Sequence, residues 1–583
     1  MPTFSPQNVV TLERLANKAR GLDAGAEETA FIDSAEMYIE KDAAKEDAVK
    51  HKRVWVRVTR LCNQRCTFCL DSWNQNGTYV PVQELMAFIK EGRDKGGERL
   101  ILSGGEASVH PEFIKLIRYG RSLGYDWIQT VTNGQMFAYP DFARKAKLAG
   151  LNEATFSMHG HTPRLHDRLV GLPGAFERGN QGIRNLQAVG GVVVNVDVVI
   201  NKLNVRYLRD IVDFYMAMGI REFDLLHIVP FGRGFEEFRD QLFFDIEAHH
   251  DDLQRAFEVS KQPGVFMWTN RLPVAQLEGY EHLIQDPHKL HSEVNGGRNN
   301  FEGFMKTGTK PDCFGERCDH CFLNGLCRGT MLPFREKHEA GGFQRVSVDL
   351  DVPSMGPRAE EAFARQRPMS VEVRGSLEAV RGYVGDAFPG AVVRAEVPTV
   401  AEVLALAADP GRVTTLVVRT VEALEALGPV LPPGLAVEAE VDAVMAAWLL
   451  EHGVGSLEGR LTLRLGNHEY LSESREVDPD PDTLARLAGL GVPLKNVPAC
   501  IAGSASRPAD HHTLPRHLVD RAGDLDIDHY VEHFVVSEYY AKSKRCRGCA
   551  LDTTCRGMHI NYLRNHGFKA LQPLASEARA ACA

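Results

Sequence analysis

Short apolar runs alternate with amphipathic stretches over residues 53–235. The runs are rich in valine and isoleucine and have the length of strands, whereas the stretches between them show the apolar spacing of helices. Strands that are each followed by a helix are typical of a parallel sheet covered by helices. The pattern predicts an α/β fold with an open, partial (β/α)6 barrel, whose strands are expected at 54–59, 99–105, 127–134, 153–160, 192–200 and 222–230.

A similar alternation returns in residues 346–499. This part is rich in alanine and valine, and it contains no close triplet of cysteines. It is interpreted as a second, degenerate α/β half-barrel-like region, with strands expected at 369–375, 413–420, 435–441 and 459–466 and helices between them at 399–408 and 442–453.

Glycines and polar residues follow the first set of strands. They form the motifs "SGGE" (103–106), "TNG" (132–134), "SMHG" (157–160) and "VPFGRG" (229–234). In parallel α/β folds the ligand lies at the carboxyl ends of the strands. These four motifs are therefore expected to meet at one edge of the sheet.

Composition narrows the class of protein. A chain of 583 residues is too long for one hydrophobic core, which favours several domains. Its net charge of -10 makes a nucleic-acid partner unlikely, because phosphate contacts need a basic face. No run approaches the roughly 18 apolar residues of a spanning helix, and the first residues do not have the pattern of a secretory signal. We expect a cytoplasmic protein with no membrane partner.

Cysteines are the most informative residues of the chain. The twelve comprise a group of three, two groups of four and Cys582. In a reducing compartment such groups indicate metal sites and not disulfides. The two groups of four share the spacing C-x2-C-x5-C-R-G after one earlier cysteine, which indicates an internal duplication or two copies of one module. The expected metal ligands here are Cys313, Cys318, Cys321 and Cys327 in the first quartet, and Cys500, Cys546, Cys549 and Cys555 in the second.

The group of three has the spacing C-x3-C-x2-C and consists of Cys62, Cys66 and Cys69. Three thiolates on one short loop can bind three irons of a four-iron cluster and leave the fourth iron open to another ligand. A structural zinc ion, the alternative, prefers four ligands, usually from two C-x2-C pairs. We therefore expect a [4Fe-4S] cluster on this loop.

With Phe68 as its aromatic residue and "LSGGE" at 102–106, this motif resembles the signature of the radical S-adenosylmethionine (radical SAM) superfamily. The resemblance covers roughly residues 53–235 and implies S-adenosyl-L-methionine as a cofactor on the open iron. It assigns the catalytic cluster to the three cysteines above. It also implies cofactor contacts from Gly104, Gly105 and Glu106 to the amino group, from Ser157 and Asn195 to the carboxylate or ribose, and from 229–234, including Pro230, to the adenine.

The resemblance also implies the reaction. An electron from the reduced cluster cleaves the sulfonium, and the resulting 5′-deoxyadenosyl radical abstracts a hydrogen atom from the substrate. Such an enzyme needs an electron donor such as flavodoxin or ferredoxin. The subclass, whether oxidoreductase, transferase or isomerase, stays open.

The two quartets resemble abbreviated SPASM-type modules, which hold auxiliary clusters. A further cysteine four residues after the last one is replaced by Met331 in the first module and by His559 in the second. Two auxiliary [4Fe-4S] clusters are expected, with zinc as the alternative because four thiolates also suit that ion.

The substrate is less constrained than the chemistry. The SPASM-like modules favour a peptide, a small molecule or sugar is the second hypothesis, and a non-catalytic iron–sulfur or zinc scaffold is the alternative of another class. His159, His161 and His166, near the expected edge, are interpreted either as substrate or proton-transfer groups or as loop hydrogen-bonding residues.

The predicted domains follow these groups. They are a helical amino-terminal extension (1–52), the radical SAM core (53–240), the first auxiliary module with a linker (241–345), the second α/β region (346–499) and the second auxiliary module (500–583).

Overall fold

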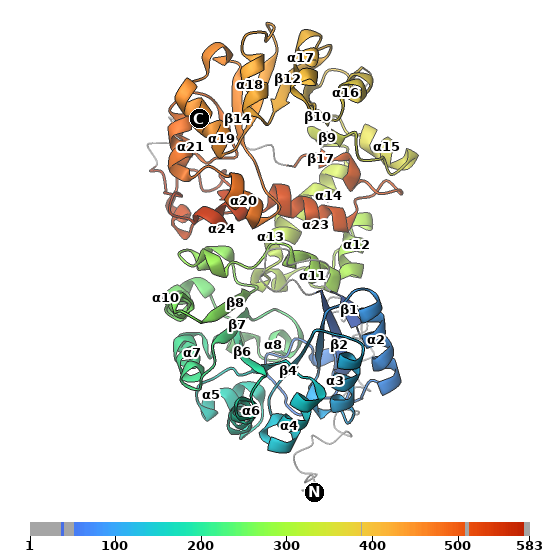
Figure 1. The fold of residues 1–583 in the computed structure, drawn as a ribbon, viewed down its shortest axis with the longest axis vertical. Helices are drawn as coiled ribbons and strands as arrows, with labels where there is room; N and C mark the ends of the chain where they lie inside the picture. The colour runs from blue at the N-terminus through green and yellow to red at the C-terminus, as the bar shows by residue number, and fades with distance from the viewer. Residues whose placement is uncertain (1–36, 40–51, 386–387, 508–511, 576–583) are drawn as a thin grey trace. The chain divides into compact units, whose positions relative to one another are not determined.

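A computed structural model describes residues 37–39, 52–385, 388–507 and 512–575 (Figure 1). The chain divides into two compact units. Unit 1 comprises Met1–Phe301 and Lys310–Asn324, and unit 2 comprises Glu302–Thr309 and Gly325–Ala583.

Unit 1 is built on one sheet with the strand order β1 to β8. Strand β1 (Met37–Ile39) is antiparallel to β2, and all later neighbours are parallel. The predicted α/β fold with a parallel sheet is confirmed. The parallel strands are β2 (Arg53–Thr59), β3 (Arg99–Gly104), β4 (Trp127–Thr132), β5 (Glu153–Ser157), β6 (Val193–Ile200), β7 (Glu222–His227) and β8 (Phe266–Asn270).

Helices follow these strands, as the alternation of apolar runs and amphipathic stretches predicts. Their apolar residues pack on the sheet while their polar residues face outward. The helices are α2 (Val82–Asp94), α3 (Phe113–Ser122), α4 (Pro140–Ala149), α5 (Pro163–Val170), α6 (Ala175–Val189) and α7 (Leu208–Ala217).

The sheet of unit 1 is curled. The backbone amide of Arg233, after β7, donates to the carbonyl of Cys69, after β2, at 3.1 Å. These strands are five positions apart in the sheet, which would separate them by roughly 24 Å if the sheet were flat. Residues of the two strands also interact directly, because Arg53 of β2 counteracts the rise that burial causes in the pKa of Asp224 of β7. The strands therefore form a partial barrel, as predicted, with one more parallel strand, β8, than the six expected.

Unit 2 contains a second sheet, in which every neighbouring pair is parallel. It is also curled, since Arg464 of β14 lies 3.4 Å from Glu372 of β10, four strands away. The second parallel region is thus confirmed. In spatial order its strands are β16 (Ser506–Arg507), β15 (Leu494–Lys495), β14 (Leu461–Leu465), β13 (Ala436–Val441), β12 (Val413–Val418), β11 (Val392–Glu396), β10 (Ser370–Arg374), β9 (Arg345–Asp349) and β17 (Leu514–Pro515).

Two parts differ from the expected elements. Of the predicted helical extension 1–52, the structure describes Lys52 and strand β1, and the rest lies outside the described residues. The linker expected at the end of the module 241–345 is partly helical: α14 spans Leu332–Glu339. Within the described ranges, no helix has the length and apolar composition needed to cross a bilayer.

Candidate functional site

The cysteine triplet lies on the connection between β2 and α2, residues 60–81, here called the cysteine loop. Its middle is tied to the end of α5. The amide of Arg65 donates to the carbonyl of Val170 at 3.1 Å, and the amide of Thr67 donates to the carbonyl of Leu169 at 2.8 Å. Such contacts offset the conformational entropy that a long loop loses on folding, so the cysteine loop has a defined path.

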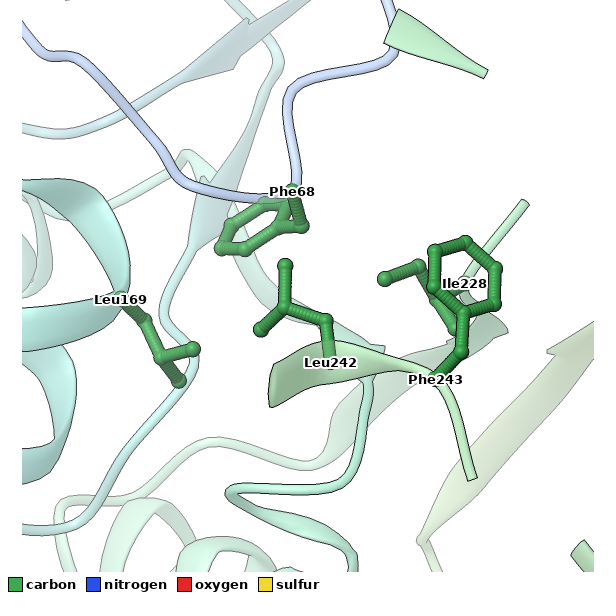
Figure 2. Close-up of a cluster of buried hydrophobic side chains, with 5 residues drawn as sticks. All are labelled: Phe68, Leu169, Ile228, Leu242 and Phe243. Carbon is green, nitrogen blue, oxygen red and sulfur yellow. The ribbon is translucent and has the colours of Figure 1, made fainter. Parts of the chain in front are cut away.

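Phe68, the aromatic residue of the cysteine motif, anchors the cysteine loop in the hydrophobic core. Its ring makes an edge contact with His159, at 4.5 Å between ring centroids. Burial of an aromatic side chain contributes about 2 kcal/mol, so the ring holds the cysteines on either side of it in place. Figure 2 shows the cluster, which consists of Phe68, Leu169, Ile228, Leu242 and Phe243.

The three thiols are unbridged, half-buried and close enough to influence one another electrostatically. Burial is the main cause that raises the pKa of all three, that of Cys69 to about 11. Two sulfur atoms accept hydrogen bonds, Cys62 from the Gln64 amide at 3.4 Å and Cys69 from the Gln75 side chain at 3.3 Å. Deprotonation therefore needs a compensating positive charge, such as a metal centre.

These thiols suit a cluster better than a single ion. No three His, Cys, Asp or Glu side chains within the described ranges converge tightly enough to hold one metal ion. A four-iron cluster offers a separate iron to each thiolate, so three thiolates need only surround it. Three free thiols on one anchored loop fit that requirement.

The turn 229–234 after β7 packs directly on the cysteine loop. Gly232 has a φ of +61°, and a Cβ at this position would overlap the carbonyl oxygen of Cys69. The next amide, of Arg233, donates to that carbonyl at 3.1 Å and to the Ser72 hydroxyl at 2.8 Å. Pro230, predicted to line the adenine, is buried in the same turn.

Gly104 and Gly105 bring the end of β3 against the start of the cysteine loop. The amide of Gly105 donates to the carbonyl of Thr59 at 2.8 Å. A Cβ on Gly105 would overlap the Leu61 carbonyl oxygen, and one on Gly104 would crowd the Thr59 carbonyl. The two glycines are thus required by the close approach of two backbones.

Glu106 is buried, with 2% of its surface exposed. Its carboxylate accepts hydrogen bonds from the Asn133 amide and the Thr132 hydroxyl, both at 2.7 Å, and from the amide and hydroxyl of Ser108. Burial raises the pKa of Glu106, and these hydrogen bonds oppose that shift. Glu106 therefore caps a short helix and ties the end of β3 to the end of β4.

Ser157 lies at the carboxyl end of β5, where it was expected. Its hydroxyl donates to Asp197 of β6 at 3.2 Å. The other carboxylate oxygen of Asp197 is buried and has no hydrogen-bond partner among the described residues. Burial, with a smaller contribution from Asp224, raises the pKa of Asp197 to about 7. Asp197 is a candidate site residue that the sequence motifs did not predict, and the signal that could have indicated it is a charge within the apolar run 192–200.

Asn195 does not lie with these groups. It precedes Asp197 by two residues on β6 and donates to Glu153 at 2.8 Å, at the amino-terminal end of β5. Glu153 also pairs with Arg99, at the start of β3. The structure therefore places Asn195 in a polar network toward the other end of the barrel.

Two of the three histidines of "HGHTPRLHD", His159 and His166, accept hydrogen bonds from the backbone, whereas His161 lies against the ring of Tyr207, at 5.7 Å between ring centroids. The ring of His159 accepts from the amide of Val199 at 3.1 Å, and the ring of His166 accepts from the amide of His159 at 3.1 Å. Burial lowers the pKa of both rings, that of His166 to about 4. Both imidazoles are held neutral.

The first quartet is divided by the unit boundary, since Cys327 belongs to unit 2 and the other three cysteines to unit 1. Within unit 1, Cys313, Cys318 and Cys321 interact electrostatically. The amide of Cys321 donates to the carbonyl of Cys318 at 3.2 Å. The pair Cys66 and Cys69 makes the corresponding bond at 3.3 Å, so the C-x2-C turn has the same form in both groups.

The second quartet lies entirely within unit 2. Cys500, Cys546, Cys549 and Cys555 are free thiols that interact electrostatically. Backbone amides donate to two of the sulfur atoms, to Cys549 from Leu574 at 3.4 Å and to Cys555 from Gly557 at 3.3 Å. Four thiolates are the ligand number of a fully ligated four-iron cluster and also of a structural zinc ion.

Comparison with known proteins supports the predicted class. Residues 56–215 match the model of the Radical SAM superfamily. This part of the chain therefore resembles a radical SAM domain, in agreement with the predicted superfamily. The auxiliary cluster modules stay a prediction.

Curated relatives match about a third of the chain. A probable GTP 3′,8-cyclase of Saccharolobus islandicus is 28% identical over 204 residues, which is 35% of this chain and 62% of the relative. An AdoMet-dependent heme synthase of Methanosarcina barkeri is 30% identical over 184 residues, 31% of this chain and 51% of the relative. The chain thus spans less than two thirds of each relative.

Solved structures give weaker matches. The crystal structure of Streptococcus suis SuiB bound to S-adenosylmethionine is 14% identical with a TM-score of 0.32, and covers 39% of this chain and 51% of that chain. At this level the similarity carries no argument about substrate.

Proposed function

We propose that this protein reductively cleaves S-adenosyl-L-methionine at a [4Fe-4S] cluster held by Cys62, Cys66 and Cys69. When bound, cluster and cofactor supply a 5′-deoxyadenosyl radical that abstracts a hydrogen atom from the substrate. The observation that carries the proposal is three free thiols on one anchored loop of a domain that matches the radical SAM superfamily.

Unpartnered polar atoms support a cofactor site beside this loop. The side-chain amide nitrogens of Gln64 and Gln135 are buried and have no hydrogen-bond acceptor among the described residues. One carboxylate oxygen of Asp197 is also buried and has no hydrogen-bond donor among them. Buried polar groups in native proteins are normally satisfied, so such atoms indicate where a polar ligand belongs. Ser157 would orient the Asp197 carboxylate, while Glu106 would fix the end of β3 near the amino group.

The two quartets are proposed to hold auxiliary [4Fe-4S] clusters. Zinc is the alternative, and iron analysis separates the two: roughly twelve irons per chain for three four-iron clusters, and about four if both quartets hold zinc. A cytoplasmic location and a flavodoxin or ferredoxin as electron donor belong to the same proposal, because exposed clusters and free thiols require reducing conditions.

The test is anaerobic reconstitution with iron and sulfide, followed by reduction in the presence of S-adenosylmethionine. The parent protein is expected to release 5′-deoxyadenosine and methionine, and the variant C62A/C66A/C69A to release neither. Equal cleavage by both proteins would refute the proposal.

For the substrate we propose a peptide, on the basis of the repeated cysteine modules. The names of the two curated relatives, a GTP cyclase and a heme synthase, favour a small molecule as the second candidate. Co-purification with a short precursor peptide, or a short open reading frame beside the gene, would support the first. Turnover of a small molecule with no peptide bound would support the second.

A further inference from the structure

The turn after β7 brings one buried cation to the cysteine loop. Arg233 is 8% exposed, and its guanidinium donates from Nη1 to the carbonyl oxygen of Cys66 at 3.0 Å. Its own backbone amide donates to the carbonyl of Cys69 at 3.1 Å. Arg233 therefore contacts the backbone of two of the three cysteines.

The charge of this guanidinium is poorly matched by protein carboxylates. Among the described residues, the one carboxylate within 4 Å is that of Glu237, at 3.8 Å from Nε, and its side chain is 41% exposed. A buried charge is costly unless a counter-charge lies nearby. The three thiols of the cysteine loop interact electrostatically with this guanidinium, and as thiolates they would supply its counter-charge.

The neighbouring cations are paired differently. Arg57 forms a 2.5 Å ion pair with Asp71 on the cysteine loop. Arg317 lies 3.6 Å from Glu236 and over the ring of Trp73, at 5.5 Å from its centroid. Of these three arginines, Arg233 has the most distant and the most solvated carboxylate partner.

We propose that Arg233 is a positioning residue that sets the reduction potential of the cluster on the cysteine loop. The inference rests on the proposed function, because it requires that cluster. Reduction adds a negative charge to a centre already surrounded by three thiolates, and a fixed buried cation stabilises the added charge. Arg233 thereby keeps the cluster within the range of a biological electron donor.

The test compares Arg233→Gln and Arg233→Lys in the reconstituted full-length protein. Gln removes the charge but retains a side-chain N–H for the Cys66 carbonyl, whereas Lys retains the charge and loses the planar fork. The control, Arg209→Gln, removes a cation that pairs with Asp213 on the surface of α7. Iron content shows cluster assembly, and electron paramagnetic resonance during a redox titration gives the ratio of reduced to oxidised cluster.

At the parent midpoint potential, R233Q is expected to show at least a threefold lower ratio of reduced to oxidised cluster, a shift of about 30 mV for one electron. R233K and R209Q are expected to stay within the error of the parent. If R233Q assembles no cluster while R233K does so with the parent potential, the charge is required and the inference stands.

Two results overturn the inference: an unchanged midpoint in R233Q, or equal loss of cluster in R233Q and R233K, which would mean a purely geometric role. A parent protein that assembles no cluster refutes the proposed function itself, so the two failures are distinguishable.

Discussion

Units 1 and 2 each contain a curled sheet in which successive parallel strands are neighbours, but the two sheets carry different side chains on their polar faces. In unit 2, cations from three strands meet one buried carboxylate. Glu438 of β13 pairs with Arg394, with Arg464 at 3.2 Å and with Lys495 at 2.8 Å. At the carboxyl edge of unit 1, by contrast, the three thiols form no disulfide, and one oxygen of Asp197 has no hydrogen-bond partner among the described residues.

The connecting loops explain this difference. After β2, residues 60–81 are long enough to carry three cysteines, whereas the corresponding connection after β9 is residues 350–356 and contains none. Between 346 and 499 there is also no second "GGE". A curled parallel sheet is therefore compatible either with a ligand site or with an internally neutralised face, and the loops at its carboxyl edge decide which.

The ion-pair face of unit 2 gives the largest expected effect. Glu438→Gln leaves Arg394, Arg464 and Lys495 without their shared carboxylate in a buried place. We expect unit 2 to lose about 3 kcal/mol of stability, measured as faster hydrogen exchange in β13 and β14. The matched change in unit 1, Glu153→Gln, leaves one cation, Arg99, and is expected to cost less, about 2 kcal/mol. Equal losses of stability in the two units would contradict the claim that the ion-pair face of unit 2 depends more strongly on its shared carboxylate.

A substitution in the turn after β7, which packs closely on the cysteine loop, is expected to cost less stability but to reduce iron binding. Gly232→Ala would place a Cβ against the Cys69 carbonyl at a φ of +61°. We expect a cost of about 2 kcal/mol and reduced iron binding by the cysteine loop. Gly453→Ala in unit 2 is the control, because its φ is +70° and no atom lies within 4 Å of the added Cβ. It is expected to cost about 1 kcal/mol and leave iron content unchanged.

The smallest effect is a dependence on pH that belongs to unit 1. The pKa of Asp197 is raised to about 7, above its value in the unfolded chain, so the folded state retains a proton that the unfolded state has lost. Stability of the metal-free protein is therefore expected to fall by about 1 to 2 kcal/mol as pH rises from about 4 to about 5.5.

Asp197→Asn should flatten that dependence, with urea unfolding at several pH values as the measurement. An identical pH profile for parent and variant would show that Asp197 ionises normally.

The alternation of strands and helices could be predicted from the sequence, because valine-rich runs indicate buried strands and amphipathic stretches indicate the helices that cover them. Strand β8 was missed, since its run "FMWTN" exposes Phe266 and Trp268 and lacks the buried valine pattern of the other strands. Periodicity alone does not reveal which strand-length run lies at an edge.

The site shows a similar limit. The cysteine spacing identified the loop, but Asn195 and Asp197 share one face of β6 and the sequence pattern does not distinguish them. The register does, because Ser157 pairs with Asp197 and Thr155 with Asn195. The contact of Arg233 with the cysteine loop likewise depends on the curl of the whole sheet, which joins residues distant in sequence.

The claim that the radical chemistry belongs to unit 1 alone is tested most directly by 5′-deoxyadenosine formation in two reconstituted variants. C546A/C549A removes half of the second quartet, and C62A/C66A/C69A removes the thiols of the cysteine loop. We expect the first to lose about four irons per chain and still cleave S-adenosylmethionine, and the second to form no 5′-deoxyadenosine. Cleavage that survives in C62A/C66A/C69A, or disappears in a folded C546A/C549A with its first cluster intact, would contradict the account.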